Sequence, residues 1–309
     1  MPNIEQLKSK APEKAVIWGD TPKDKIPSGF KPGGPGYYIA GVFEKLNVEV
    51  TLVSCIGRDY PKEMLPKVRL IPATPTGDES MVYDNIYTPD GHRIQFAFLN
   101  DCAKFPTYTD ITQSGLGFLV YTQDLLFITP LRRVEPDVVK DICRNFLDSM
   151  TIGLIQGWGR DIASDGKVSK RNVDEVDRDI ERIKNEFNLL VYSDEDMDDA
   201  VEWGRKWSEG ENVPIVVVTQ NINGCTVCVG GEAFPINACP IDQIKDPTGA
   251  GDRFAAFFAF MYKITNDWQV SVRFANAGTA YALQNGNGKI ELDRILQFAE
   301  DHGRPIFLI

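Results

Sequence analysis

The chain has 309 residues, of which 43% are hydrophobic, and a formal net charge of −11 at pH 7. Its length suits one large α/β domain or two smaller ones. The acidic balance argues against a general nucleic-acid surface, because such surfaces gather lysines and arginines. No apolar run approaches the roughly 20 residues that span a bilayer, and the polar N-terminus has no signal-peptide pattern, so we expect a soluble cytoplasmic protein.

The six cysteines are scattered along the chain and do not resemble a disulfide scaffold. Cys225 and Cys228 have the C-x-x-C spacing, but their neighbours look like a strand, in which positions three apart point to opposite faces. We therefore predict two structural thiols. With only two histidines in the chain, histidine-based metal or triad chemistry has little support.

The first predicted strand covers residues 15–18 and ends at Gly19-Asp20. Ligands of open α/β sheets bind at the carboxyl ends of strands, so Asp20 is a candidate ligand contact, with a turn cap as the alternative. Residues 21–32 are rich in proline, lysine and glycine, which predicts an exposed loop or a small ribbon. Gly33-Gly34-Pro35-Gly36 then opens an apolar helix, without the third glycine of a Rossmann fingerprint.

A predicted hairpin follows a strand at 48–56 and a turn at 57–61 that leads into another helix. Its two strands cover residues 80–87 and 92–99, on either side of Thr88-Pro89-Asp90-Gly91. Together with residues 21–32, the hairpin could form a small β-sheet lid that closes on a substrate and excludes water. An ordinary hairpin at the edge of the main sheet is the alternative.

From residue 124 onward, predicted strands and helices alternate with short connections. The expected strands lie at 125–128, 152–155, 189–192, 215–219 and in the β-rich stretch 225–234, and the expected helices at 136–147, 173–187, 194–207, 268–283 and 291–302. This alternation predicts a mostly parallel sheet that is covered on both faces. We expect a single domain over residues 1–309, with lid segments at approximately 21–32 and 79–100.

The most specific motif is Asp246-Pro247-Thr248-Gly249-Ala250-Gly251-Asp252, which runs into an apolar helix. Gly249 and Gly251 allow a ligand to approach the backbone, and a helix N-terminus offers N–H groups to an anion. Asp252 would repel that anion unless it takes a proton from a group that attacks the anion. Phosphoryl transfer to a hydroxyl uses both parts. A helix start with a capping aspartate is the alternative.

This string resembles the C-terminal signature of the ribokinase (pfkB) family of carbohydrate kinases. Gly33-Gly34 resembles the family's N-terminal glycine signature, and Gly57-x-Asp59 resembles its next turn. Residues 216–219 with Asn223-Gly224 are similar to its nucleotide-side strand and turn. The resemblance covers nearly the whole chain. It implies a three-layer α/β/α sandwich with a mostly parallel central sheet and a small β-sheet lid.

The resemblance also implies that the phosphate comes from ATP with Mg²⁺, and it leaves open a monovalent cation. Asp252 would be the general base, and Gly249, Ala250 and Gly251 would form the anion hole. The residues expected to face the phosphate acceptor are Asp20, Gly33 and Gly34. Those expected near the nucleotide are Thr219, Gly224, Thr248 and Asn276. Asp196 would hold Mg²⁺ through water, at the place of the family's Asn-x-x-Glu element.

Some positions depart from the ribokinase pattern and narrow the range of acceptors that we expect. Tyr38 stands where ribokinases carry an asparagine that contacts the sugar, which argues against ribose itself. The motifs at 33–38, 58–61 and 156–160 together look like a subgroup that includes inositol kinases. Arg93 on the hairpin and Arg160 after its strand are candidates for acceptor or phosphate contacts.

We therefore expect a small-molecule kinase that moves the ATP γ-phosphate to a hydroxyl of a sugar or polyol, either inositol-like or a hexose. A nucleoside kinase of the same family is the alternative, with an aromatic slot from Tyr37, Tyr38 or Phe96. A non-catalytic ligand sensor on the same fold is an alternative from another class, although the presence of Asp252 argues against it. We expect no nucleic-acid or membrane partner, and a monomer or a homodimer through the lid.

Overall fold

A nine-stranded sheet forms the centre of the computed structural model, which describes residues 4–87, 93–113, 123–244 and 247–307. Its strand order is β15-β14-β13-β12-β9-β8-β1-β4-β5. All neighbours from β13 to β5 are parallel, whereas β14 and β15 are antiparallel at one edge. The strands are β1 (Lys14–Gly19), β4 (Glu49–Val53), β5 (Val68–Ile71), β8 (Leu125–Thr129), β9 (Met150–Leu154), β12 (Leu189–Ser193), β13 (Ile215–Thr219), β14 (Cys225–Val229) and β15 (Glu232–Ile236). The prediction of a mostly parallel sheet is confirmed.

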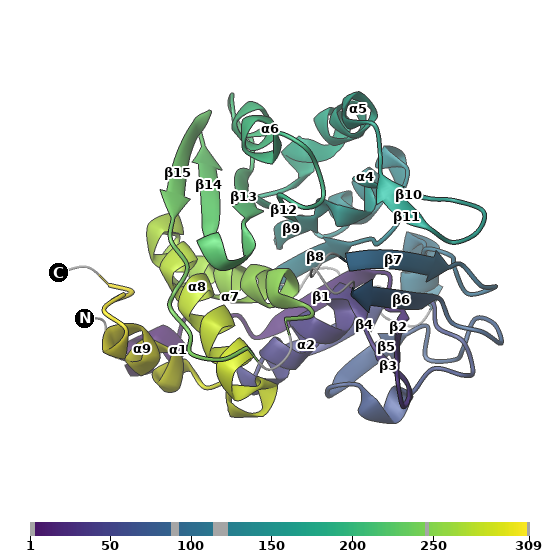
Figure 1. Ribbon diagram of the computed structural model, residues 1–309, viewed down its shortest axis with the longest axis horizontal. Coiled ribbons are helices and arrows are strands. Elements are labelled where there is room, and N and C mark those ends of the chain that lie inside the picture. The colour runs from purple at the N-terminus through teal and green to yellow at the C-terminus, as the bar shows by residue number, and fades with distance from the viewer. Residues whose placement is uncertain (1–3, 88–92, 114–122, 245–246, 308–309) are drawn as a thin grey trace.

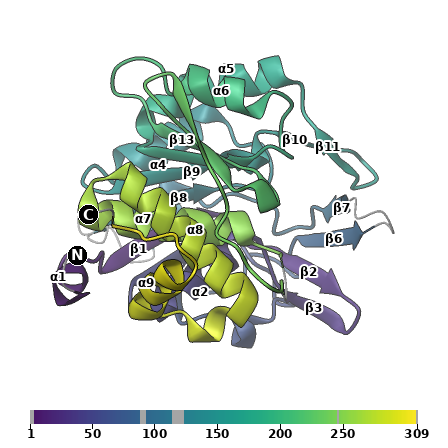
Figure 2. The same ribbon diagram turned by 60° about the vertical axis from the view of Figure 1, so that its left-hand side comes forward.

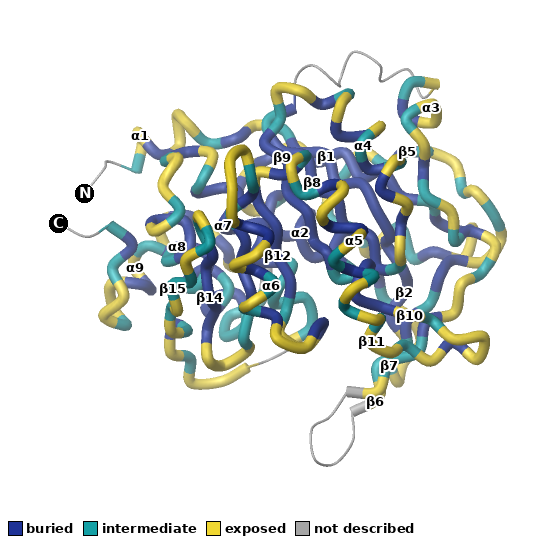
Figure 3. Tube along the Cα trace, turned by 90° about the horizontal axis from the view of Figure 1, so that it is seen from above, coloured by how far each residue is buried: buried dark blue, intermediate teal, exposed yellow. Residues whose placement is uncertain are grey.

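Helices cover both faces of this sheet, and the buried residues follow its strands (Figures 1 and 3). One face carries α2 (Gly34–Lys45), α7 (Ala250–Thr265), α8 (Trp268–Asn285) and α9 (Leu292–Asp301), and the other carries α4 (Pro136–Arg144), α5 (Val173–Ile183) and α6 (Ala200–Trp207). The short helices are α1 (Ile4–Lys8) and α3 (Tyr108–Ile111). In β1, Ala15 and Ile17 join one hydrophobic cluster, and Val16 and Trp18 join the other. Such strands are continuous apolar runs because both of their faces are buried.

The two cysteines of β14 behave as the strand pattern predicts. Cys225 packs into the hydrophobic cluster on one face of the sheet, and Cys228 packs into the cluster on the opposite face. Both thiols are free, and burial raises the pKa of Cys225 to about 12 and that of Cys228 to about 11. The prediction of structural thiols agrees with this placement.

A second, four-stranded sheet stands beside the central one (Figures 1 and 2). Its order is β3 (Gly29–Pro32), β2 (Lys23–Ile26), β6 (Val82–Tyr87) and β7 (Arg93–Phe98). The hairpin predicted within 80–99 and the ribbon predicted within 21–32 thus join in one small sheet, which we call the lid. The predicted turn at residues 88–91 lies outside the described residues.

A short ribbon that the sequence pattern did not predict lies against the lid. It consists of β10 (Arg160–Ile162) and β11 (Val168–Lys170), which pair antiparallel. The backbone N–H of Ala97 in β7 donates to the carbonyl oxygen of Gly166, at 2.7 Å, in the turn of this ribbon. The ribbon therefore ties one lid strand to the segment that follows β9.

Two helix predictions are wrong in extent. The turn at 57–61 leads only into a 3₁₀ turn, Lys62–Met64, before β5, because Leu65 precedes a proline and has to be extended. The helix expected over 194–207 begins at Ala200, because Asp196 folds back and accepts a hydrogen bond from the Ser193 N–H at 3.0 Å. None of the helices within the described ranges is long and apolar enough to cross a membrane.

Candidate active site

The N-terminus of α7 begins with a glycine turn whose geometry requires glycine. Gly249 has φ +74° and is the N-cap of the helix. A Cβ atom at this position would overlap the ring of Tyr38. The N–H of Arg253 donates to the Gly249 carbonyl at 3.0 Å, which starts the helical hydrogen bonding. The Ala250 N–H donates to the Pro247 carbonyl at 3.2 Å, so the groups at this helix terminus suited to an anion are the N–H groups of Gly251 and Asp252 that follow it.

The ring of Tyr38 packs against this glycine turn. Its side chain is buried, and the guanidinium carbon of Arg253 lies 4.8 Å from the centre of its ring. Arg253 Nη1 in turn donates to the Thr248 carbonyl at 2.6 Å. Tyr38 thus holds the 248–249 backbone through both contacts, and its contact with an acceptor stays a prediction.

Open space lies in front of the turn at Gly251. A Cβ atom built on Gly251 would meet no non-neighbouring atom closer than the Thr219 hydroxyl oxygen, at 4.0 Å. Thr219 ends β13, and its hydroxyl donates to the Tyr192 carbonyl at 3.2 Å. The predicted anion-hole residue Gly251 and the predicted nucleotide contact Thr219 are therefore neighbours in space.

Asp252 lies in the first turn of α7, beside this space. Burial raises the pKa of its carboxyl to about 7, and the nearby charges of Asp24 and Asp196 act in the same direction. The guanidinium groups of Arg253 and Arg160 oppose the rise. A carboxylate with a pKa near the working pH is well matched to accept a proton from a hydroxyl.

Asp24 faces the same site, although the sequence reasoning missed it. It is buried on β2, and its carboxylate fills the place where a Cβ atom on Gly33 would project. Gly34 follows at φ +72° and begins α2. The composition of residues 21–32 predicts an exposed loop or a small ribbon and does not distinguish Asp24 from its neighbours. The sequence signal that could have identified Asp24 is an acidic residue between two lysines, in a segment that precedes the glycine pair Gly33-Gly34.

The carboxylate of Asp20 is hydrogen-bonded to the segment that follows β8. Its Oδ2 accepts from the Leu131 N–H at 3.0 Å, and its Oδ1 accepts from Arg132 Nε at 3.3 Å. Burial raises the pKa of Asp20, against the opposing charge of Arg132. The carboxylate thus anchors this segment, and the contact between Asp20 and the acceptor stays a prediction that the geometry supports less well than one by Asp24.

Arg160 lies between the lid and Asp252, the predicted general base. Its buried guanidinium lies 3.6 Å from Asp196 Oδ1, and its charge lowers the pKa of the Tyr83 hydroxyl on β6. The Tyr83 hydroxyl donates to the Leu131 carbonyl at 2.9 Å, and burial raises the pKa of Tyr83 to about 12. Arg160 also lowers the pKa of Asp252, so this guanidinium acts on the lid residue Tyr83, on Asp196 and on Asp252.

The other predicted residues lie in two places. Gly224 has φ +98°, and a Cβ atom there would overlap the Ile236 carbonyl oxygen. Nearby, Asn276 Nδ2 lies 3.5 Å from the Asn237 carbonyl, so both residues border the 236–238 segment. Arg93 begins β7 and pairs with Tyr87 at the far end of the lid hairpin, and its side chain lies outside the described part of the structure.

Phe96 faces away from this site, which corrects its assignment to an aromatic slot. The neighbouring Ala97 is buried against the body, so Phe96 projects from the opposite face of β7. Phe96 there stacks on Phe98 at 6.5 Å between ring centres and pairs with Asp84, whose carboxylate binds Lys25 at 2.7 Å.

Asp196 is the carboxylate at this site that was predicted to hold Mg²⁺ through water. Asp196 keeps two oxygens near the Ser193 N–H and Arg160, and the described residues contain no group of three or more histidine, cysteine or acidic side chains that could hold a metal ion. Mg²⁺ is commonly bound by one or two carboxylates together with water and substrate phosphates. Asp196 fits that limited role.

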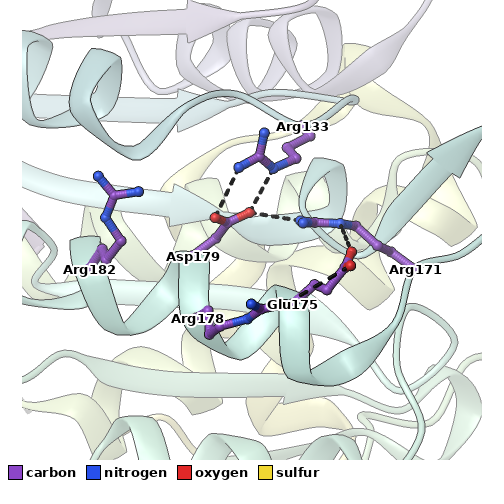
Figure 4. A pocket seen from close by; sticks show the side chains of 6 residues that line it. All are labelled: Arg133, Arg171, Glu175, Arg178, Asp179 and Arg182. Carbon is purple, nitrogen blue, oxygen red and sulfur yellow. Dashed lines mark hydrogen bonds and ion pairs between the residues drawn. The ribbon is translucent and has the colours of Figure 1, made fainter.

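A groove on another part of the molecule is lined by charged residues of α5 and its surroundings (Figure 4). Asp179 at its centre accepts from Arg133 Nε at 2.8 Å and from Arg171 Nη1 at 2.7 Å. Arg178 and Arg182 also lie within ion-pair distance of acidic partners. The network connects α5 to the segment after β8, which accounts for the arginines structurally.

Residues 180–293 match the pfkB family carbohydrate kinases. Two curated proteins, each named Bifunctional protein HldE and from Rhodopseudomonas palustris strains BisB18 and BisA53, are 39% identical over 82 and 79 residues. These matches cover 26% and 25% of this chain but 16% of each relative, so they span about a sixth of the relatives' length.

Solved structures share the fold along most of the chain. Arabidopsis thaliana ribokinase complexed with ribose and ATP has a TM-score of 0.65 and 15% identity, covering 93% of this chain and 98% of its own. A pyrophosphate-dependent ribokinase-family kinase, complexed with a pyrophosphate analog and myo-inositol, has a TM-score of 0.63 and 15% identity, with coverages of 88% and 94%. The nucleoside kinase of Methanocaldococcus jannaschii has a TM-score of 0.61 and 15% identity, with coverages of 94% and 99%. Residues 180–293 thus resemble the pfkB family of carbohydrate kinases, and the described residues have the ribokinase fold that the sequence predicted.

Proposed function

We propose that this protein transfers the γ-phosphate of ATP to a hydroxyl group of a sugar or polyol, either inositol-like or a hexose. One observation carries the proposal: Asp252, with its pKa raised to about 7, lies in the same helical turn as the Gly249–Gly251 anion site. A proton acceptor and an anion-binding backbone are the two parts that phosphoryl transfer to an alcohol requires.

The chain's own groups divide the reaction between them. Asp252 takes the proton of the attacking hydroxyl, and the N–H groups at the start of α7 stabilise the charge of the transferred phosphoryl group. Mg²⁺ would supply further neutralisation of phosphate charge, with Asp196 holding it through water. Arg253 and Arg160 oppose the rise in the pKa of Asp252 and so favour its ionised form, and Arg160 adds positive charge next to the transfer path.

The donor would lie on the β13–β14 side of the sheet, where Thr219 faces Gly251. Gly224 and Asn276 border the neighbouring 236–238 segment, and Thr248 lies at the turn itself. One structural relative is described as pyrophosphate-dependent, so pyrophosphate belongs in the donor test beside ATP. A monovalent-cation requirement belongs in the same test.

The acceptor side favours a polyhydroxylated compound over a nucleoside. Asp24, Arg160 and Tyr83 surround the approach to Asp252 and offer charged and hydrogen-bonding groups. A nucleobase would need an apolar slot, but the ring of Tyr38 is covered by Gly249 and Phe96 faces outward, so of the three predicted aromatic residues only the half-buried Tyr37 stays a candidate. The nucleoside-kinase alternative therefore has less support.

The test is ADP release from ATP and Mg²⁺ against a panel of inositols, hexoses, pentoses and nucleosides. We expect turnover with a polyol or hexose, and its loss in Asp252→Asn while ATP binding persists. Turnover with nucleosides alone would establish the alternative acceptor class. Ligand binding without turnover, for every acceptor and for both donors, would instead favour the non-catalytic sensor.

A further inference from the structure

The two faces of the lid differ in chemistry because side chains alternate along its strands. Tyr83 on β6 is paired with Ala97 on β7, and both are buried against the body together with Leu131. This is the inner face of the lid. The outer face carries Phe96 and Phe98, which stack on each other.

One polar pair lies on the inner face next to Tyr83. Asn85 is two residues beyond Tyr83 on β6, and it is paired across the strands with Gln95 on β7. Gln95 Nε2 donates to Asn85 Oδ1 at 2.6 Å. Both side chains are half-buried, so they are neither core residues nor fully solvated ones.

This amide pair keeps unused hydrogen-bonding capacity. An amide side chain has two N–H donors and a carbonyl acceptor, so one mutual bond leaves three donors and a carbonyl oxygen. A hydroxyl group both donates and accepts, and it complements a neighbouring donor and acceptor. The pair is therefore suited to neighbouring hydroxyls of one ligand.

The position of the pair relates it to the candidate site. Asp24 is the register partner of Tyr83, and the charge of Arg160 acts on both Tyr83 and Asp252. Two residues along a strand advance roughly 7 Å, so the amides lie about that far beyond this row toward the lid tip. That advance is comparable to the breadth of a six-membered ring that carries hydroxyl groups.

We infer that Asn85 and Gln95 determine acceptor specificity by binding hydroxyl groups of the acceptor remote from the one that is phosphorylated. The inference rests on the proposed function and narrows it to an acceptor with hydroxyls around a ring. Rejection of an analogue that lacks such a hydroxyl follows, because the amides would then be left unsatisfied under a closed lid.

The test compares Asn85→Leu, Gln95→Met and the double variant with Asp84→Leu. Asp84 is next to Asn85 but projects from the outer face, where it binds Lys25 at 2.7 Å, so it controls for a polar-to-apolar change in the same strand. KM and kcat are measured for the best cyclic polyol and for its deoxy analogues, together with KM for ATP.

In the double variant we expect the acceptor KM to rise at least about tenfold, with kcat and the ATP KM nearly unchanged. Discrimination against one deoxy analogue should shrink by a similar factor, and Asp84→Leu should preserve it. Unchanged KM and discrimination in the double variant would overturn the inference while leaving the kinase intact. Absence of turnover by the unsubstituted protein with every polyol would refute the proposed function itself.

Discussion

Asp252→Asn should make the protein less active and, at alkaline pH, more stable. The unfolded carboxyl has the ordinary pKa of 3.8, whereas burial raises the folded value to about 7. Below about pH 4 the carboxyl is protonated in both states and its burial costs little. Between about pH 4 and pH 7 the unfolded carboxyl is ionised while the buried one stays protonated, so stability falls as pH rises through this range, and the loss is complete above the folded pKa of about 7.

The size of this effect follows from the pKa difference. A rise from 3.8 to about 7 corresponds to an upper limit of roughly 4 kcal/mol at pH 8. Because the side chain keeps some solvent contact, we expect about 1–3 kcal/mol. Asparagine resembles the protonated carboxyl in shape and stays neutral, so the variant should gain this stability at pH 8 and progressively less toward pH 5.

The assay combines urea unfolding at pH 5 and pH 8 with ADP release. Removal of a general base should lower kcat by about a hundredfold to ten-thousandfold. Asp198→Asn is the matched control, because its side chain is 85% exposed and it lies outside the site. A stability gain that does not grow between pH 5 and pH 8 would refute the burial argument. Near-normal turnover in the variant would refute the base assignment.

The other predictions concern neighbouring groups and the lid. In a plot of kcat/KM against pH, Arg160→Gln should shift the rise in activity to higher pH, because the charge of Arg160 lowers the pKa of Asp252. A rise at the same pH in the variant would contradict this. Gly251→Ala should lower kcat with little change in unfolding midpoint, since its Cβ finds open space, whereas Gly249→Ala should lower stability by at least about 1 kcal/mol through strain at φ +74°. Comparable stability losses in both variants would mean that Gly251 is structural. If the lid forms the predicted homodimer through its outer face, Phe98→Lys should raise the dimer dissociation constant in sedimentation equilibrium, and a monomer at all concentrations would exclude that interface.

Patterns along the chain predicted the layers of the fold because the central strands are buried on both faces. The run at 15–18 became β1, and the glycine motif became the start of α7. The predicted hairpin became part of the lid. The segment at 57–71 was mispredicted, because an isolated proline-flanked turn and a short edge strand carry little periodic signal.

The acceptor side was harder to predict because it depends on which face each residue occupies. Asp20 and Asp24 are both acidic and four positions apart, yet Asp20 binds Leu131 and Arg132 whereas Asp24 lies against Gly33. A one-residue change of register reverses the faces of a strand. The observed register β2–β6 fixes Asp24 beside Tyr83, and no local pattern contains that pairing.

The same alternation explains how one short sheet can serve two surfaces. Inward positions such as Tyr83, Asn85 and Gln95 are buried or half-buried and polar at their tips. Outward positions such as Ile94 and Phe98 are 39% and 43% exposed, although large apolar side chains are costly to leave in water. Exposed apolar residues gathered on one face are typical of surfaces that bind another molecule. A partner on the outer face would hold the lid without touching the acceptor, so substitutions on the two faces should change different measurements: association on the outer face and acceptor KM on the inner.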